Sequence, residues 1–197
     1  MSLRCSVVIP TYNRAGLLRL SLDALARQTL PAAEFEVVIA DDGSTDGTDR
    51  VVDEYRDRLT IRYVFQPDEG YRSAAARNLG IAHASAEILV LIDCGVILHS
   101  GALTAHVETH EQADVPVAVC GYVFCFNEDN EDGELMKRTL DPADPDGSIA
   151  MMTERRQWLD IREEFYDKYG EDFSGLPAPC WSGGAATCPP APRRSAG

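Results

Sequence analysis

Residues 5–111 alternate short apolar runs with segments of helical hydrophobic spacing, and this alternation restricts the fold more than any other feature. Each apolar run has the length and continuity of a strand buried on both faces. Strands that alternate with helices form a parallel sheet with helices on both faces, so the sequence predicts an α/β fold. Ser44 or Thr45 is expected to cap the second helix. The expected strands cover residues 5–10, 35–40, 61–65 and 87–92, and the expected helices cover 17–28, 44–55, 72–84 and 102–111.

The remainder of the chain follows a less regular pattern. The apolar run 115–126 predicts one long strand or two short ones. Residues 127–138 and 141–148 are rich in Gly, Pro and Asp and are expected to form loops. Large apolar side chains at helical spacing predict an amphipathic helix over 153–169. Residues 182–197 are small residues, Pro and Arg without an apolar face, and they are expected to be disordered.

The charge balance argues against broad binding to nucleic acid or to anionic lipid. Lys and Arg total 18 against 32 Asp and Glu, a formal net charge of −14, and such partners require the opposite balance. No apolar run reaches the roughly 18–20 residues that span a bilayer. The N-terminus lacks a signal-peptide pattern, and the six cysteines form no CxxC pair. We therefore expect a cytoplasmic protein with reduced thiols.

Polar clusters follow three of the expected strands, at residues 11–14, 41–43 and 93–95. Ligands of open parallel sheets bind beyond the carboxyl ends of the strands, so these clusters predict a ligand site at one edge of the sheet. Carboxylates there can accept a base N–H, accept ribose hydroxyls or hold a metal ion. An Asp-Asp-Gly turn can equally be structural punctuation. The GxGxxG fingerprint is missing after the first strand, which argues against a dinucleotide enzyme.

Four motifs in order carry a resemblance to a known family: SVVIPTYNR, VVIADDGSTDGT, GYRSAAARNLGIAHA and ILVLIDCG. Their order and spacing over residues 4–125 resemble family 2 glycosyltransferases with the GT-A fold. The stretch from QPDEG to LIDCG, with a later WSGG, is particularly similar to the N-acetylgalactosamine-transferring domains of chondroitin-polymerase-type enzymes. The resemblance implies a GT-A, Rossmann-like, mostly parallel sheet with helices on both faces.

The resemblance also implies a function and a domain organisation. The function is transfer of a sugar, with inversion, from a nucleotide donor (UDP above all) to an acceptor that the sequence does not identify, using Mn or Mg. The alternatives are a non-catalytic nucleotide-sugar-binding module or an inactive fragment, and, from the alternation alone, a flavodoxin-like or nucleotidyl-transfer domain. Residues 1–126 would form the nucleotide-sugar-binding core and 127–181 an acidic acceptor-side region with one helix. Residues 182–197 would be a disordered or non-native tail.

The resemblance assigns the residues after the first strand to the uracil pocket. Pro10, Thr11 and Tyr12 would line this pocket, with Arg14 at its rim. An aromatic side chain such as Tyr12 has a face on which a base can stack.

The resemblance assigns four further residues to the nucleotide and the donor sugar. Asp41 would accept the uracil N3–H, and Asp42 would lie beside it. Arg77 would lie near the uridine or its diphosphate, and Arg72 near the donor sugar. The two arginines are five residues apart, so both can face one phosphate only if one of them stands at the start of the helix.

Asp93 matches the first residue of the family's Asp-x-Asp motif, which contacts ribose or sugar, but Gly95 replaces the Asp that usually binds the metal. Either Asp93 holds Mg or Mn together with waters and the diphosphate, or cationic side chains neutralise the leaving group. Gly95→Asp is then expected to strengthen the effect of Mn on UDP binding.

The resemblance also weakens at the end of the chain. Ala185 replaces an Asn of the family after WSGG, and the Glu-Asp motif that supplies the general base does not follow, so no catalytic base is assigned. We therefore expect a truncated or frame-shifted chain with poor transfer activity. Self-association is expected through apolar surface near Val117, Val119 and Trp181.

Overall fold

The computed structural model describes residues 2–125, 133–160, 162 and 163, and the chain divides into two compact units, 1–108 and 109–197. No helix among the described residues is long and apolar enough to cross a membrane. The functional boundary expected near residue 126 stays a prediction.

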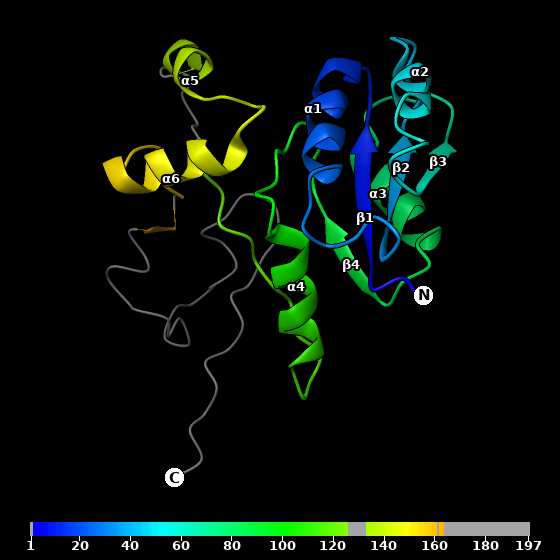
Figure 1. Ribbon diagram of the computed structural model, residues 1–197. Helices are drawn as coiled ribbons and strands as arrows, with labels where there is room; N and C mark the ends of the chain where they lie inside the picture. Colours follow the sequence, from blue (N-terminus) through cyan, green and yellow to red (C-terminus); the bar gives the residue numbers. More distant parts are fainter. Residues whose placement is uncertain (1, 126–132, 161, 164–197) are drawn as a thin grey trace, which may run out of the picture. The chain divides into compact units, whose positions relative to one another are not determined.

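The first unit contains a four-stranded sheet in the order β3-β2-β1-β4, in which all neighbouring strands are parallel (Figure 1). The register places Thr11 opposite Asp41 and Asp41 opposite Phe65, so three strands end at the same level. These strands confirm the expected fold class. They are β1 (Cys5–Thr11), β2 (Phe35–Asp41), β3 (Ile61–Phe65) and β4 (Ile88–Leu91).

Every residue of β1 and β2 is buried, as expected for continuous apolar runs in the middle of a parallel sheet. Alternate residues such as Val7 and Ile39 belong to the main hydrophobic core, together with apolar residues of three helices. The opposite face of the sheet is covered by a helix that packs on β1 and β2. The helices of this part of the chain are α1 (Ala15–Leu25), α2 (Thr48–Asp53), α3 (Ser73–Ala82) and α4 (Ala102–Glu111).

The position of helix α3 on the sheet leaves no room for a side chain at Gly80. A Cβ atom at Gly80 would lie 2.5 Å from Cγ1 of Val8 and 3.3 Å from Cβ of Ala40. The helix follows β3 and begins at the carboxyl edge of the sheet, with Arg72 as its N-cap residue. The close approach therefore fixes the place of α3 at that edge.

The expected cap of α2 is wrong. The helix begins at Thr48, and its N-cap is Gly47 in the left-handed conformation with φ of +87°. Ser44 and Thr45 instead form hydrogen bonds with Asn13, 31 and 32 residues earlier. Ser44 and Thr45, which the sequence suggested as helix caps, thus join the loop after β2 to the loop after β1.

The second unit has two helices where loops were expected, α5 (Gly133–Thr139) and α6 (Pro145–Arg155). The start of α6 has a clear local cause. Asp144 is the N-cap, its carboxylate accepts a hydrogen bond from the Gly147 backbone N–H at 3.0 Å, and Pro145 occupies the first turn. The prediction of a loop over 141–148 is therefore confirmed for residues 141–144 and wrong for 145–148, and the loop predicted for residues 133–138 is wrong as well.

The strand expected over 115–126 is also wrong for the described residues up to 125, which form no strand. Their backbone groups bind side chains and isolated carbonyls instead of a ladder. The Val123 N–H donates to Oδ2 of Asp160 at 2.7 Å, and the Cys125 N–H donates to the Trp158 carbonyl at 2.8 Å.

The helix expected over 153–169 is wrong at residues 156–160. Helix α6 ends at Arg155, and both Arg156 and Trp158 have the left-handed backbone conformation, with φ of +47° and +51°. Consecutive helical hydrogen bonds cannot continue through such residues. Of the remaining part of that prediction only residues 162 and 163 are described, and the tail 182–197 lies outside the described residues.

Candidate functional site

The loops that follow β1, β2 and β4 contact one another at the carboxyl edge of the sheet. The Asn13 N–H donates to Oγ of Ser44 at 2.8 Å, and the Thr45 N–H donates to Oδ1 of Asn13 at 2.8 Å. The Thr11 hydroxyl lies 3.5 Å from the Cys94 sulfur and donates to it. These contacts bring together the three polar clusters that the sequence singled out.

The residues at the end of β1 divide into a buried and an exposed pair. Pro10 and Thr11 are buried within the strand, whereas Tyr12 and Arg14 are exposed. Tyr12 and Arg14 can therefore contact a ligand with their side chains, whereas Pro10 and Thr11 are part of the protein interior below them.

Asp41 is fully buried at the end of β2, and both of its carboxylate oxygens accept protein hydrogen bonds. The Ser44 N–H donates to Oδ1 at 2.7 Å, and the Tyr63 hydroxyl donates to Oδ2 at 2.5 Å. Burial, and then the bond to Asp41, raise the pKa of Tyr63 well above its ordinary value. Each carboxylate oxygen has a second lone pair, so Asp41 retains the capacity to accept one more N–H.

Asp42 is also buried and holds the loop between β3 and α3. Its carboxylate accepts hydrogen bonds from Nε2 of Gln66 at 2.6 Å and from the Arg72 N–H at 3.1 Å. The Arg72 guanidinium also lies 3.5 Å from Oδ1 of Asp42 and donates to Glu69 and to the Pro67 carbonyl. Asp42 and Arg72 therefore determine the conformation of this loop.

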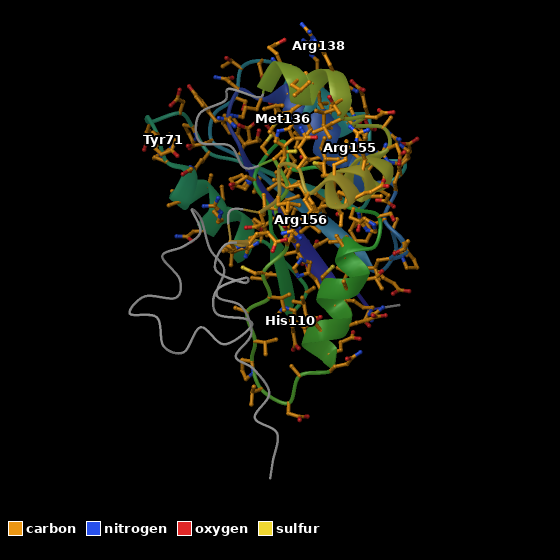
Figure 2. All side chains as sticks on the ribbon, turned by 90° about the vertical axis from the view of Figure 1, so that its left-hand side faces the viewer. Tyr71, His110, Met136, Arg138, Arg155 and Arg156 are labelled. Carbon is orange, nitrogen blue, oxygen red and sulfur yellow. The ribbon has the colours of Figure 1, made fainter. Side chains whose placement is uncertain are left out.

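The structure adds Asp68, which the sequence interpretation missed. The Tyr12 hydroxyl donates to Oδ2 of Asp68 at 2.7 Å, and this bond holds the pKa of Asp68 below and that of Tyr12 above the ordinary values. Gly43, with φ of +93°, allows the approach, because a Cβ there would lie 2.5 Å from the Asp68 nitrogen. The signal for Asp68 was its Asp-Glu-Gly turn after a strand, the same type of turn as at residues 41–43. In the same loop Tyr71 is 94% exposed and lies on the outside (Figure 2).

Arg77, in α3, forms an ion pair with the residue after β4. Its Nη2 lies 2.6 Å from Oδ1 of Asp93, and the two side chains are 31% and 62% exposed. Arg72 stands at the start of α3, so the condition for both arginines to face one ligand is met. Their guanidinium groups nevertheless bind different partners, Arg72 those of the loop after β3 and Arg77 the carboxylate after β4.

The turn after β4 does not present a second carboxylate. Gly95 has φ of +103°, a conformation that L-residues rarely adopt, and its N–H donates to Oγ of Ser21 at 3.0 Å. Burial raises the pKa of the Cys94 thiol, so this sulfur stays protonated and is a poor metal ligand. Among the described residues no group of three or more His, Cys, Asp or Glu side chains could hold a metal ion. The described donor set therefore does not fit a preformed divalent-metal site at Asp93.

An open hollow lies beside the start of α2, on the side of Asp41 where Tyr63 approaches. None of the nine residues assigned from the sequence lines it. Its lining residues are Ser44, Thr45, Asp46, Gly47, Asp49, Arg50, Tyr63 and Phe65.

Comparison with known sequences identifies relatives over most of the chain. The sequence model described as Glycosyl transferase family 2 matches residues 6–175. Validoxylamine A glucosyltransferase of Streptomyces hygroscopicus subsp. jinggangensis is 39% identical over 174 residues, which cover 88% of this chain and 41% of that protein. Chondroitin synthase of Escherichia coli is 43% identical over 89 residues, 45% of this chain and 13% of that protein. The resemblance drawn from the motifs is confirmed, and the chain spans well under half the length of these relatives.

Solved structures agree with this result. TarS 1–349 of S. aureus in complex with UDP-GlcNAc superimposes with a TM-score of 0.52 at 25% identity, covering 64% of this chain and 42% of that one. Mannosyltransferase PcManGT from Pyrobaculum calidifontis, in complex with GDP-Man and Mn²⁺, gives a TM-score of 0.51 at 29% identity, covering 69% and 39%. The expected GT-A fold is thereby confirmed.

Proposed function

Because this chain belongs to glycosyl transferase family 2, we propose that it binds a UDP-sugar at the carboxyl edge of its sheet and transfers the sugar with inversion to an acceptor hydroxyl. One observation carries the proposal. The loops after β1, β2 and β4, which hold the family's motifs, are joined by hydrogen bonds into a single site. The complex of TarS with UDP-GlcNAc, a structure of similar fold, supports uridine as the nucleotide.

We assign the uracil to the carboxyl ends of β1 and β2. Tyr12 would stack on the base, Pro10 and Thr11 would form the floor beneath it, and Asp41 would accept the N3–H. Arg14, which is exposed, would close the rim. A carboxylate that is already held by two protein donors is fixed in place, so it can select a base with an N–H at the right position.

We assign the remaining groups to the ribose, the diphosphate and the sugar. Asp42 and Arg72 would shape the wall beside the donor sugar, and Arg77 and Asp93 would face the diphosphate and the ribose. Transfer breaks the bond between the anomeric carbon and the diphosphate oxygen, which keeps the electron pair, while the acceptor oxygen forms the new bond. The acceptor proton passes to a general base, and none of the residues assigned above has that role.

The divalent metal of the family is not part of this proposal. The described residues do not offer the pair of carboxylates that would hold Mn²⁺ or Mg²⁺, since Gly95 stands at the second position and Asp93 binds Arg77. The transfer reaction described above therefore uses no metal ion. The positive charge that the leaving diphosphate requires must come from elsewhere in the site.

The relatives indicate which donor and acceptor to test first. The validoxylamine A glucosyltransferase matches 88% of this chain, so UDP-glucose as the donor and validoxylamine A as the acceptor are the first candidates. The four free cysteines of the described residues suit a reducing compartment, and we propose that the chain acts in the cytoplasm. We further propose that residues 127–181 contact the acceptor.

The test is release of the nucleotide from a set of donors: UDP-glucose, UDP-N-acetylglucosamine, UDP-N-acetylgalactosamine and GDP-mannose, each with and without acceptor. Because no general base is assigned, we expect slow UDP release from one UDP-sugar, and a loss of this release in Tyr12→Ala. Arg56→Ala is the matched control, because Arg56 pairs with Asp53 and donates to the Ile61 carbonyl, where β3 begins at the opposite edge of the sheet. Preferential release of GDP would contradict the uridine assignment. Tight binding of UDP without any release would favour the alternative, a non-catalytic nucleotide-sugar-binding module.

A further inference from the structure

Arg77, a residue of α3, places a positive charge beside the turn after β4. The guanidinium of Arg77 lies 2.6 Å from Oδ1 of Asp93, the first carboxylate of the family's metal motif. Among the described residues Asp93 is the ion-pair partner of Arg77, and the Arg77 side chain is 31% exposed. Arg77 is thus positioned at the carboxylate beside which a relative's metal ion would bind.

The geometry of Gly95 explains why a metal ion is not favoured there. A carboxylate at this position would require an L-residue at φ of +103°, and its Cβ would lie 3.4 Å from Cβ of Leu17. The intervening thiol of Cys94 is buried, accepts a hydrogen bond from the Thr11 hydroxyl at 3.5 Å and donates to the Arg14 carbonyl at 3.8 Å. The turn therefore offers one carboxylate, and that carboxylate is neutralised by Arg77.

The surroundings of the site increase the need for a cation. Asp42 and Asp68 are further carboxylates at the same edge, and carboxylates repel the negative charges of a diphosphate. Arg72 donates to Glu69 and to the Pro67 carbonyl and lies 3.5 Å from Asp42, which leaves only its buried Nε without a hydrogen-bond partner in the described part of the chain. The Arg77 guanidinium has five N–H donors and uses one of them for Asp93. It can therefore bind the Asp93 carboxylate and phosphate oxygens at the same time.

We propose that Arg77, held by Asp93, takes the place of the divalent cation and binds the diphosphate of the nucleotide, so that nucleotide binding does not depend on a metal ion. This inference rests on the proposed function, because it presupposes a nucleoside diphosphate at this edge.

The experiment compares the affinities for UDP and for uridine by calorimetry, each in Mn²⁺ and in EDTA. The proteins are the wild type, Arg77→Gln, Arg77→Lys and Arg56→Gln. For the wild type we expect the same UDP affinity, within about threefold, in Mn²⁺ and in EDTA. Arg77→Gln should lower UDP affinity about tenfold or more and leave uridine affinity nearly unchanged, since uridine has no phosphate. Arg77→Lys should retain part of the affinity because it keeps the charge, and Arg56→Gln should behave as the wild type.

The contrary outcomes are distinct. A tenfold fall in wild-type UDP affinity on adding EDTA would overturn the inference and leave the proposed function intact. An equal loss of UDP and uridine affinity in Arg77→Gln would overturn it as well, because Arg77 would then contact the nucleoside. Absence of binding of both UDP and uridine to the wild type would overturn the uridine donor and this inference together. Equal melting temperatures of the variants show that each result concerns binding and not folding.

Discussion

The hydroxyl of Tyr63 donates a 2.5 Å hydrogen bond to Oδ2 of the fully buried Asp41. The bond joins the end of β2 to the middle of β3, since Tyr63 lies two residues before Phe65, the register partner of Asp41. It fixes the carboxylate to which we assign the base, before any nucleotide binds. The candidate site is therefore built partly by β3, a strand from which the sequence assigned no site residue.

Tyr63→Phe should lower the free energy of unfolding by about 1–3 kcal/mol, because it leaves a buried carboxylate oxygen without its donor. Chemical denaturation monitored by fluorescence measures this difference. Tyr71→Phe is the control, since its hydroxyl belongs to a side chain that is 94% exposed, and it should be neutral. Equal stabilities of the wild type and Tyr63→Phe would show that the bond does not stabilise the fold.

The same bond predicts a dependence on alkaline pH. The pKa of Tyr63 is raised in the folded chain by burial and by Asp41, so the unfolded chain releases its phenol proton first. The stability that this proton confers is complete below about pH 10, the ordinary value of Tyr, and is lost as pH rises towards the folded value. Between about pH 9 and pH 11 the wild type should thus lose more stability than Tyr63→Phe. Parallel curves would contradict the prediction, since other tyrosines contribute equally to both proteins.

Gly80→Ala should destabilise the chain by about 1–3 kcal/mol through overpacking, because its Cβ would lie 2.5 Å from Cγ1 of the fully buried Val8. Gly16→Ala is the matched control in α1: no atom lies within 4 Å of its Cβ, and stability should stay equal or rise. Adding Val8→Ala to Gly80→Ala should give a protein more stable than the sum of the single effects. If the two stability changes were strictly additive, the added Cβ at residue 80 would not contact Val8, which would contradict the prediction.

Gly95→Asp should cost about 1–3 kcal/mol of stability, because its backbone has φ of +103°. Gly133→Ala is the control, a glycine without positive φ and with no atom near its Cβ. The restored Asp-x-Asp motif is therefore expected to strengthen the effect of Mn²⁺ on UDP affinity only at the expense of the fold. Full stability together with a large effect of Mn²⁺ would show that the turn accepts an L-residue without strain.

The sequence predicted the sheet well because its central strands need no tertiary information. The runs at β1 and β2 are apolar throughout, and such runs are buried in a parallel sheet wherever they pair. The convergence of Asp41 and Asp93 at one edge follows from the parallel topology alone. These inferences depend on periodicity and chain direction, both of which are local.

The errors arose where a group binds a residue far away along the chain. Ser44 is an acceptable cap residue, but its hydroxyl binds Asn13. The backbone of Val123 binds Asp160, 37 residues later, so an apolar run did not become a strand. Asp68 was missed because its partner, Tyr12, is 56 residues away. The cap of α6 at Asp144 is different, since Asp-Pro is a local signal that the loop interpretation overlooked.

The most direct test of the whole account is hydrogen exchange of the chain with and without UDP. We expect UDP to slow exchange at residues 11–15, 41–46 and 93–96, the loops that the structure joins at the carboxyl edge. The opposite edge, where β3 begins near Arg56, should exchange at the same rate in both states. Protection confined to that opposite edge, or no protection by UDP anywhere, would contradict a uridine nucleotide site at the carboxyl edge.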